Sequence, residues 1–194
     1  MPEPSRFRLA PILLEASFVV LGVFLALVAN EWRSDANARE RATHARASIV
    51  EEIETNRAAT AASHAYHGRL LDSLRTYFPP DHPPPSPTLF SRGFIRPITL
   101  LNTAWEAANA TDAVGHMDYD EVLAFSKLYA MQRRYERSAT EAGSVIYSEI
   151  MARGVPGVAA NHRNLAYLIG AFYYLEEGLL EAYDEALGAL SEAH

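Results

Sequence analysis

The most constraining feature of this sequence is an apolar run near its start, from Pro11 to Ala29, in which Glu15 is the only charged residue. As a helix, its nineteen residues would be about 28 Å long, close to the roughly 30 Å hydrocarbon core of a bilayer. Trp32 follows where interfacial aromatic residues usually lie. The sequence therefore predicts an uncleaved transmembrane anchor over residues 11–32, preceded by a tail over residues 1–10.

A secretory signal peptide is the alternative interpretation of this run, with Arg6 and Arg8 as its charged start. However, the run is longer than the usual hydrophobic core of a signal peptide, and the small residues Ser34 and Ala36 come only after a charged stretch. We therefore favour the anchor. Arginines flank it on both sides, so the positive-inside rule does not decide on which side of the membrane the remaining chain lies.

Four residues of the anchor are candidate contacts with partner helices. Glu15 lies about one turn inside the predicted boundary, where its carboxylate either stays at the headgroup level or meets a donor on a partner helix. Gly22 and Ala26 form a small-x-x-x-small pair that would let another helix approach closely. Trp32 completes the set as the interfacial residue.

Charge and composition exclude several classes of function. The formal net charge is −7, and a chain without a basic face cannot displace the counterions of a nucleic acid, so we expect no nucleic-acid partner. The absence of cysteine excludes disulfides and thiolate metal sites. The mean hydropathy of −0.09 is that of a soluble domain, so we expect most of the chain outside the lipid.

After the anchor, the absence of turn signals predicts that the membrane helix continues as a stalk over residues 33–78. Positions that alternate by three and four predict the packed face of this stalk. Its apolar ends should pack tightly and its polar middle loosely. The face consists of Ile49, Ile53, Asn56, Thr60, Ser63, His67, Leu70, Leu74 and Tyr77.

A proline-rich stretch ends the stalk. Six of the nine residues from Pro79 to Pro87 are proline, which stops a helix and favours extended polyproline II backbone. We expect a stiff connector within an irregular segment over residues 79–97. The alternative is a docking peptide for an aromatic groove.

The remaining residues, 98–194, predict a helical domain that packs back on the stalk. The sequence Gly154–Gly157 is a stop signal between its two long helices. The expected elements are a short helix starting near Thr99 with Trp105 on its apolar side, a long helix from Asp118 to about Arg153, and a last helix over residues 160–190. The predicted fold class is all-α: one transmembrane helix continuing into a stalk, packed with two long helices and one shorter helix as an extramembrane bundle.

The last helix shows the clearest division into two faces. Its apolar stripe consists of Leu165, Leu168, Phe172, Leu175, Leu179 and Tyr183. Its acidic residues are Glu176, Glu177, Glu181, Asp184, Glu185 and Glu192. We expect these acids to form a solvated face, with a docking face for a basic partner as the alternative.

The N-terminal residues resemble a known family signature. The sequence LGVFLALVANEW, followed by the arginine-rich helical start RSDANARERATHAR, is similar to the start of an uncharacterised family of bacterial single-pass membrane proteins. The matching features are the early acid Glu15, the centre Leu21–Val23 and the polar exit Asn30–Trp32. The resemblance implies a single-pass anchor in the bacterial inner membrane and a helical domain, and it implies no activity.

Two groups of residues could bind a metal ion. His64 and His67 lie three residues apart on the stalk, and His116 and Asp118 lie in an acidic stretch. Both groups have a simpler interpretation, as half-buried histidines and as a helix N-cap at Asp118. We therefore predict no metal site, no cofactor and no catalytic residue, and do not expect an enzyme.

The leading functional hypothesis is a structural or interaction protein: an accessory subunit that stabilises a larger membrane assembly, such as a photosynthetic or respiratory complex. Its partners would be the lipid bilayer and other membrane-protein subunits, and a homo-oligomer is compatible with this hypothesis. The alternative is a membrane-tethered sensor that relays a signal through the stalk, with the polar residues 56–67 as its switch. A third hypothesis is a membrane-bound enzyme that uses His64, His67 and the acids of residues 118–121.

Overall fold

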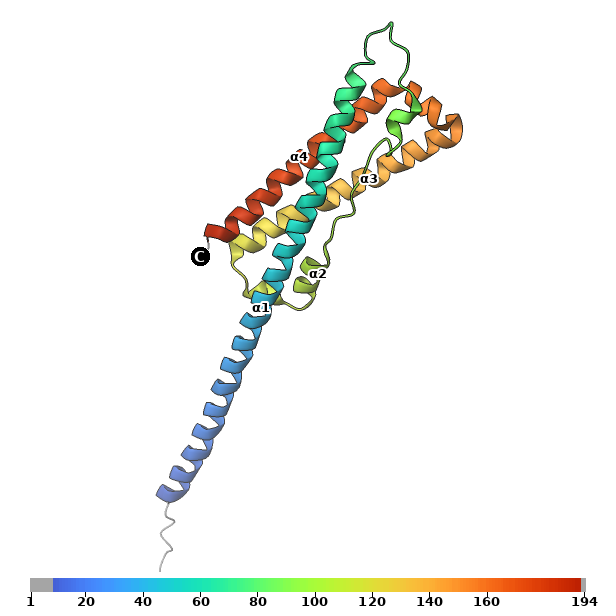
Figure 1. Ribbon diagram of the computed structural model, residues 1–194. Coiled ribbons are helices and arrows are strands. Elements are labelled where there is room, and N and C mark those ends of the chain that lie inside the picture. The colour runs from blue at the N-terminus through green and yellow to red at the C-terminus, as the bar shows by residue number, and fades with distance from the viewer. Residues whose placement is uncertain (1–8, 193–194) are drawn as a thin grey trace, which may run out of the picture.

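The computed structural model describes the backbone of residues 9–192 and the side chains of residues 14–188. Most of the predicted tail, residues 1–8, and the last two residues, 193–194, lie outside the described residues, as does the side chain of Glu192. The described part of the chain contains four α-helices and two 3₁₀ turns, without β-strands (Figure 1). The predicted all-α class is therefore confirmed.

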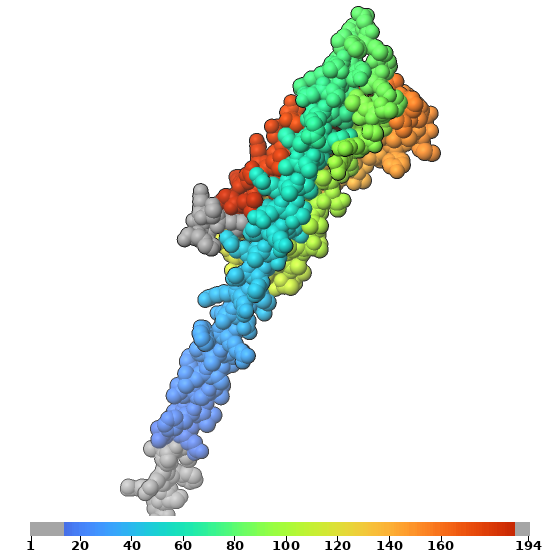
Figure 2. All heavy atoms as spheres, viewed as in Figure 1, coloured from blue at the N-terminus to red at the C-terminus, as the bar shows by residue number. Residues whose placement is uncertain are grey.

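Helix α1 (Leu9–Arg75) contains both the predicted anchor and the predicted stalk in 67 continuous residues, a length of about 100 Å. It ends three residues before the predicted end of the stalk at residue 78. All described side chains from Leu14 to Asn37 are exposed, and the first buried side chain is that of Ala38. Among the described residues, α1 is the one helix long and apolar enough to span a membrane, and none of its most apolar window is buried (Figure 2).

The other helices pack on the part of α1 that lies farther from the N-terminus (Figure 1). Helix α4 (His162–Glu192) runs along α1, and α3 (Tyr119–Ala160) packs on α4. The short helix α2 (Thr103–Ala110) and the turn η2 (Ala113–His116) contact α1 near the end of the bundle that faces the anchor. The predicted bundle of two long helices and one shorter helix on the stalk is thus confirmed.

The short helix begins later than predicted, at Thr103 and not near Thr99. Residues 93–102, which we call the strap, are irregular and cross the bundle without secondary structure of their own. Asn56 explains part of the difference, because its side chain pairs with both backbone groups of Leu101. The strap follows the turn η1 (Pro87–Phe90), whose Phe90 is buried.

The predicted stop at Gly154 is a kink inside α3. Regular helix ends there, because Gly154 has the non-helical values φ 70° and ψ 172°, and a short second helical segment that contains Pro156 follows and runs to Ala160. The kink turns the last residues of α3 back toward the bundle, where Val158 and Ala159 are buried against α1 and α4 residues such as Leu165. Helix α4 then begins at His162, two residues later than predicted.

Gly154→Ala should destabilise the bundle, because this combination of φ and ψ is accessible almost only to glycine. We expect a loss of about 1–3 kcal/mol in the free energy of unfolding, measured by urea denaturation followed by circular dichroism. Gly143→Ala is the matched control, because Gly143 lies in regular helix of α3 and a Cβ there meets nothing within 4 Å. It should stabilise by up to about 1 kcal/mol. Equal effects of the two substitutions would contradict this explanation of the kink.

The core of the bundle consists of two hydrophobic clusters with a polar zone between them. Ile49 and Ile53 of α1 belong to the cluster nearer the anchor, and Leu70 and Leu74 to the distal one. The polar residues between them are also buried, with exposures of 0–2% for Asn56, Thr60, Ser63 and His67. The predicted face of α1 is therefore right, and the prediction of loose packing in its middle is wrong.

Candidate functional site

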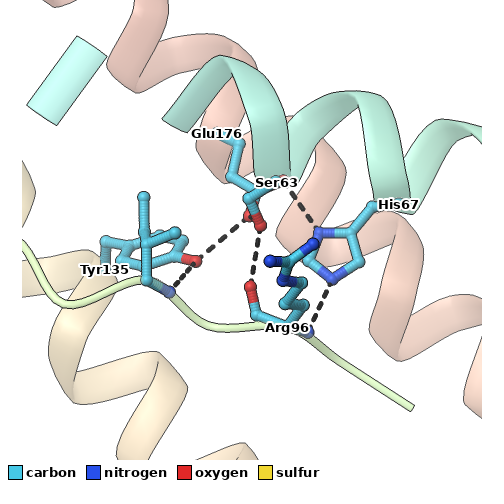
Figure 3. Close-up of polar contacts among 6 residues, drawn as sticks. Ser63, His67, Arg96, Tyr135 and Glu176 are labelled. Carbon is cyan, nitrogen blue, oxygen red and sulfur yellow. Dashed lines mark hydrogen bonds and ion pairs between the residues drawn. The ribbon is translucent and has the colours of Figure 1, made fainter. Parts of the chain in front are cut away.

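The polar zone centres on four side chains from three helices. Ser63 and His67 come from α1, Tyr135 from α3 and Glu176 from α4 (Figure 3). Glu176 and His67 are both 0% exposed. The prediction that the acids of the last helix form a solvated face is thus wrong for Glu176. It is right for the other described acids of that helix, Glu177, Glu181, Asp184 and Glu185, which are exposed.

Geometry determines the protonation of His67. The backbone N–H of Arg96 donates to its Nε2 at 3.0 Å, and an amide N–H can only donate, so Nε2 carries no proton. The proton therefore lies on Nδ1, which donates to Oε2 of Glu176 at 2.8 Å. The contact between the two residues is accordingly a hydrogen bond from a neutral imidazole to a carboxyl group.

The other oxygen of Glu176 meets two hydroxyl groups. Tyr135 donates to Oε1 at 3.1 Å, and Ser63 Oγ lies 2.7 Å from the same atom. Ser63 Oγ also lies 2.8 Å from the carbonyl oxygen of Arg96. Since a serine hydroxyl has one proton, it can donate to only one of these two acceptors at a time.

The residue types of this cluster resemble a serine–histidine–acid triad, but their connectivity does not. In such a triad the histidine accepts the serine proton, and the acid orients the histidine. Here Ser63 and His67 both contact Glu176. The unprotonated nitrogen of His67, Nε2, already accepts from the N–H of Arg96 and so does not accept from Ser63. This arrangement cannot activate Ser63 as a nucleophile, and it points to a structural role.

That role is to supply hydrogen-bond partners for the backbone N–H and C=O groups of the strap. Buried N–H and C=O groups need partners, and the strap has no neighbouring strand to supply them. Along the strap, polar side chains of the bundle supply these partners instead. Tyr66 donates to the carbonyl of Gly93 at 2.6 Å, and Asn56 pairs with the N–H and C=O of Leu101 at 2.8 and 2.7 Å. Between them, Ser63 contacts the C=O of Arg96 and His67 accepts from its N–H (Figure 3). Tyr135 accepts from the N–H of Ile98 at 3.4 Å.

A second buried carboxylate continues this arrangement where the strap ends. Oε2 of Glu52 accepts from the N–H of Ala104 at 2.9 Å and from the hydroxyl of Thr103 at 3.2 Å. It therefore caps the start of α2, where a negative charge is favourable. Oε1 accepts from the hydroxyl of Tyr129 at 2.6 Å. Glu52 thus connects α1, α2 and α3.

Three buried tyrosines around these carboxylates should make the bundle sensitive to alkali. Burial raises the pKa of Tyr183 to about 12, and burial together with a nearby carboxylate raises the pKa of Tyr129 and of Tyr135. An unfolded tyrosine ionises near pH ~10. The unfolded state therefore releases protons first, and stability should fall as the pH rises from about 10 to about 12.

Urea denaturation between pH 8 and about 11.5 would measure this loss. In Tyr183→Phe, which removes one of the three titrating groups, stability should fall less steeply over the same pH window. An unchanged steepness would show that Tyr183 does not contribute to the alkaline loss.

The candidate metal ligands fall into two separate places. Both ring nitrogens of His67 are hydrogen-bonded, to Glu176 and to Arg96. His64 stacks on Tyr173 with ring centroids 4.0 Å apart. Asp118 accepts from the backbone N–H groups of Asp120 and Glu121, which is the predicted N-cap, while His116 is exposed. Within residues 14–188, no three histidine or acidic side chains converge in a way that could hold a metal ion.

The candidate anchor residues are all exposed, and three of them share one face of α1. Successive helical residues are about 100° apart, so Glu15, Gly22 and Ala26 lie within about 40° of one another. Trp32 lies roughly 100° away from Glu15 on the helix surface. The first three residues could therefore contact one partner helix together, and Trp32 would face a different direction.

Comparison with known proteins adds no relative to this description. No family model matches the chain, and no curated protein or solved structure matches it significantly.

Proposed function

We propose that this chain is a membrane-anchored interaction protein, an accessory subunit that stabilises a larger membrane assembly. One observation carries the proposal: the apolar N-terminal part of α1 extends beyond the bundle with every described side chain exposed. Large apolar side chains there, such as Phe18 and Phe24, are 65% and 60% exposed. Such a surface requires lipid or another apolar surface around it.

The continuous helix supports this proposal because it holds the bundle close to the membrane. Ala38, the first buried residue of the bundle, lies six residues after Trp32, which is about 9 Å of helix. The near end of the bundle, with α2 and η2, therefore lies just above the headgroups. A membrane subunit next to the anchor would be able to contact both the anchor and this end of the bundle.

The face of Glu15, Gly22 and Ala26 is the proposed contact within the membrane. A small residue lets a second helix approach closely, and a carboxyl group inside the hydrocarbon gains from a donor on that helix. The host is proposed to be an assembly of the bacterial inner membrane. A contact with a partner helix on one face of α1, together with a rigid bundle outside the membrane, suits a stabilising subunit.

Co-purification from native membranes tests this function. The protein would be extracted in mild detergent and separated by size, and the co-migrating proteins would be identified. Recovery in stoichiometric amounts within one large complex is the expected result. Gly22→Leu with Glu15→Gln should reduce that recovery, while Phe24→Leu, on the opposite face of α1, should not. Recovery of the protein without other subunits would contradict the proposal.

A membrane-tethered relay is a second candidate, favoured by a specific observation. The same uninterrupted helix connects the anchor with Ser63 and His67, which hold the strap. A shift of α1 in the membrane would therefore act directly on the hydrogen bonds of Arg96 and Leu101. Hydrogen exchange of the strap amides in bilayers of two hydrocarbon thicknesses, which would shift α1, would test this, and unchanged protection would argue against the relay.

A further inference from the structure

The distal end of the bundle carries a groove that the proposed function does not use. The groove lies between the end of α1 and the start of α4 and has a volume of about 790 Å³. Gly68 and Leu71 line it from α1 and Gly170 from α4, and the ring of Tyr173 packs close to Gly68. Two tyrosines of α4 that line it, Tyr167 and Tyr174, are 80% and 70% exposed. Aromatic side chains that are this exposed typically mark a binding surface.

The proline-rich segment at the same end of the molecule is largely exposed to solvent. After a turn closed by the hydrogen bond from His82 N–H to Pro79 O, residues 83–86 have no regular secondary structure, and the rings of Pro83, Pro84 and Pro85 fix φ near the polyproline II value. Ser86 has φ −60° and ψ 141°, close to polyproline II values. With three residues per turn, Pro84 and Pro87 lie on one edge of this backbone, and both are exposed, while Pro85 is buried.

We propose that the groove of one chain binds the segment Pro83–Pro87 of a second copy, which makes the protein a dimer at its distal end. Tyr167 and Tyr174 are seven residues apart, about 10.5 Å along α4. Pro84 and Pro87 are one polyproline turn apart, about 9.3 Å. Each proline ring can therefore pack on one tyrosine, as proline-rich segments do in aromatic grooves.

The charges of the groove and of the arriving chain are also complementary. Arg75 and Arg163 line the groove, with Asp72 as its only acidic lining residue. Arg75 contacts Asp72, and Arg163 donates to the carbonyl of Phe78, so each guanidinium retains further N–H donors. Asp81 is exposed and lies two residues before the arriving segment, so those donors can bind its carboxylate.

The anchors explain why the occupant is a second copy. Two copies in one membrane stand parallel, and in each of them both the groove and the proline-rich segment lie at the end farthest from the anchor (Figure 1). No residue of 83–87 lines the groove of its own chain. Direct pairing of two parallel α4 helices is disfavoured, because the exposed Glu177 and Glu181 would face their own copies.

Cysteine cross-linking of the full-length chain in native membranes tests this dimer, because the sequence has no cysteine of its own. Ser86→Cys places a thiol between the two prolines, and Ala171→Cys places one between the two tyrosines, at exposed positions. Mild oxidation of the double variant should give a disulfide-linked dimer on a non-reducing gel. Each single variant should stay monomeric, as should Ser86→Cys with Tyr147→Cys, which places the second thiol on an exposed position of α3.

Adding Tyr167→Ala and Tyr174→Ala to the double variant should lower the cross-linked fraction by about tenfold, because two aromatic contacts are lost. An unchanged fraction would overturn the proposal. So would a disulfide within one chain, an absent cross-link, or a dimer formed by Ala171→Cys alone. This dimer is independent of the proposed accessory role, since co-purification with other subunits does not require the distal groove.

Discussion

Glu176→Ala should lower the free energy of unfolding of the bundle by roughly 3–5 kcal/mol, the largest loss we expect from a single side chain. The carboxyl group is 0% exposed and accepts from His67 and Tyr135 while contacting Ser63. Without it, these groups lose their partner in a place that water does not reach. Urea denaturation followed by the fluorescence of Trp105, which packs on Tyr129 in the bundle, would measure the loss.

Glu177→Ala is the matched control, because its side chain is adjacent in sequence but exposed. It should change stability by less than about 0.5 kcal/mol. Glu176→Gln should cost less than the alanine substitution, since the hydroxyls of Ser63 and Tyr135 can rotate to accept from the amide. A loss below about 1 kcal/mol for Glu176→Ala would show that the cluster does not hold the strap.

Replacing Val20 and Phe24 by arginine should move the protein from the membrane fraction to the soluble fraction. Both residues lie near the centre of the predicted span and are exposed on the helix surface. An arginine at the centre of a membrane helix costs about 2.5–3.5 kcal/mol, so two together cost roughly 5–7 kcal/mol. Fractionation after carbonate extraction would show the change.

The bundle should remain folded in this variant, because Val20 and Phe24 are exposed and precede Ala38, the first buried residue of the described part of α1. Its urea denaturation should match that of the unchanged protein. Val20→Leu with Phe24→Leu is the control and should stay in the membrane fraction. If the arginine variant also stays there, α1 is not what attaches the protein to the membrane.

Periodicity was sufficient to predict which face of α1 is buried, because a helix that packs along its whole length repeats its contacts every three or four residues. The burial of the polar middle could not be predicted in the same way. Its partners are backbone groups of the strap, such as those of Leu101, which is 45 residues from Asn56. Local sequence does not indicate which distant backbone a polar residue will pair with.

Glu176 could have been recognised from its position. Apart from Ala166, the buried residues of α4 alternate by four and three, and Leu165, Ile169, Phe172, Glu176, Leu179 and Tyr183 belong to this series. The predicted stripe used Leu168 and Leu175 instead, which are only partly buried. A stripe chosen by residue type passes over Glu176, whereas the register of the helix places this acid on the buried face of the described part of α4.

The length of α1 also limits which molecules can interact with the distal end. From Trp32 to Arg75 the helix is continuous and rises about 65 Å. A short neighbour embedded in the same bilayer would therefore pass beneath the groove without touching it. Only a molecule whose extramembrane part extends equally far from the bilayer, or one that approaches from the aqueous side, can contact the groove.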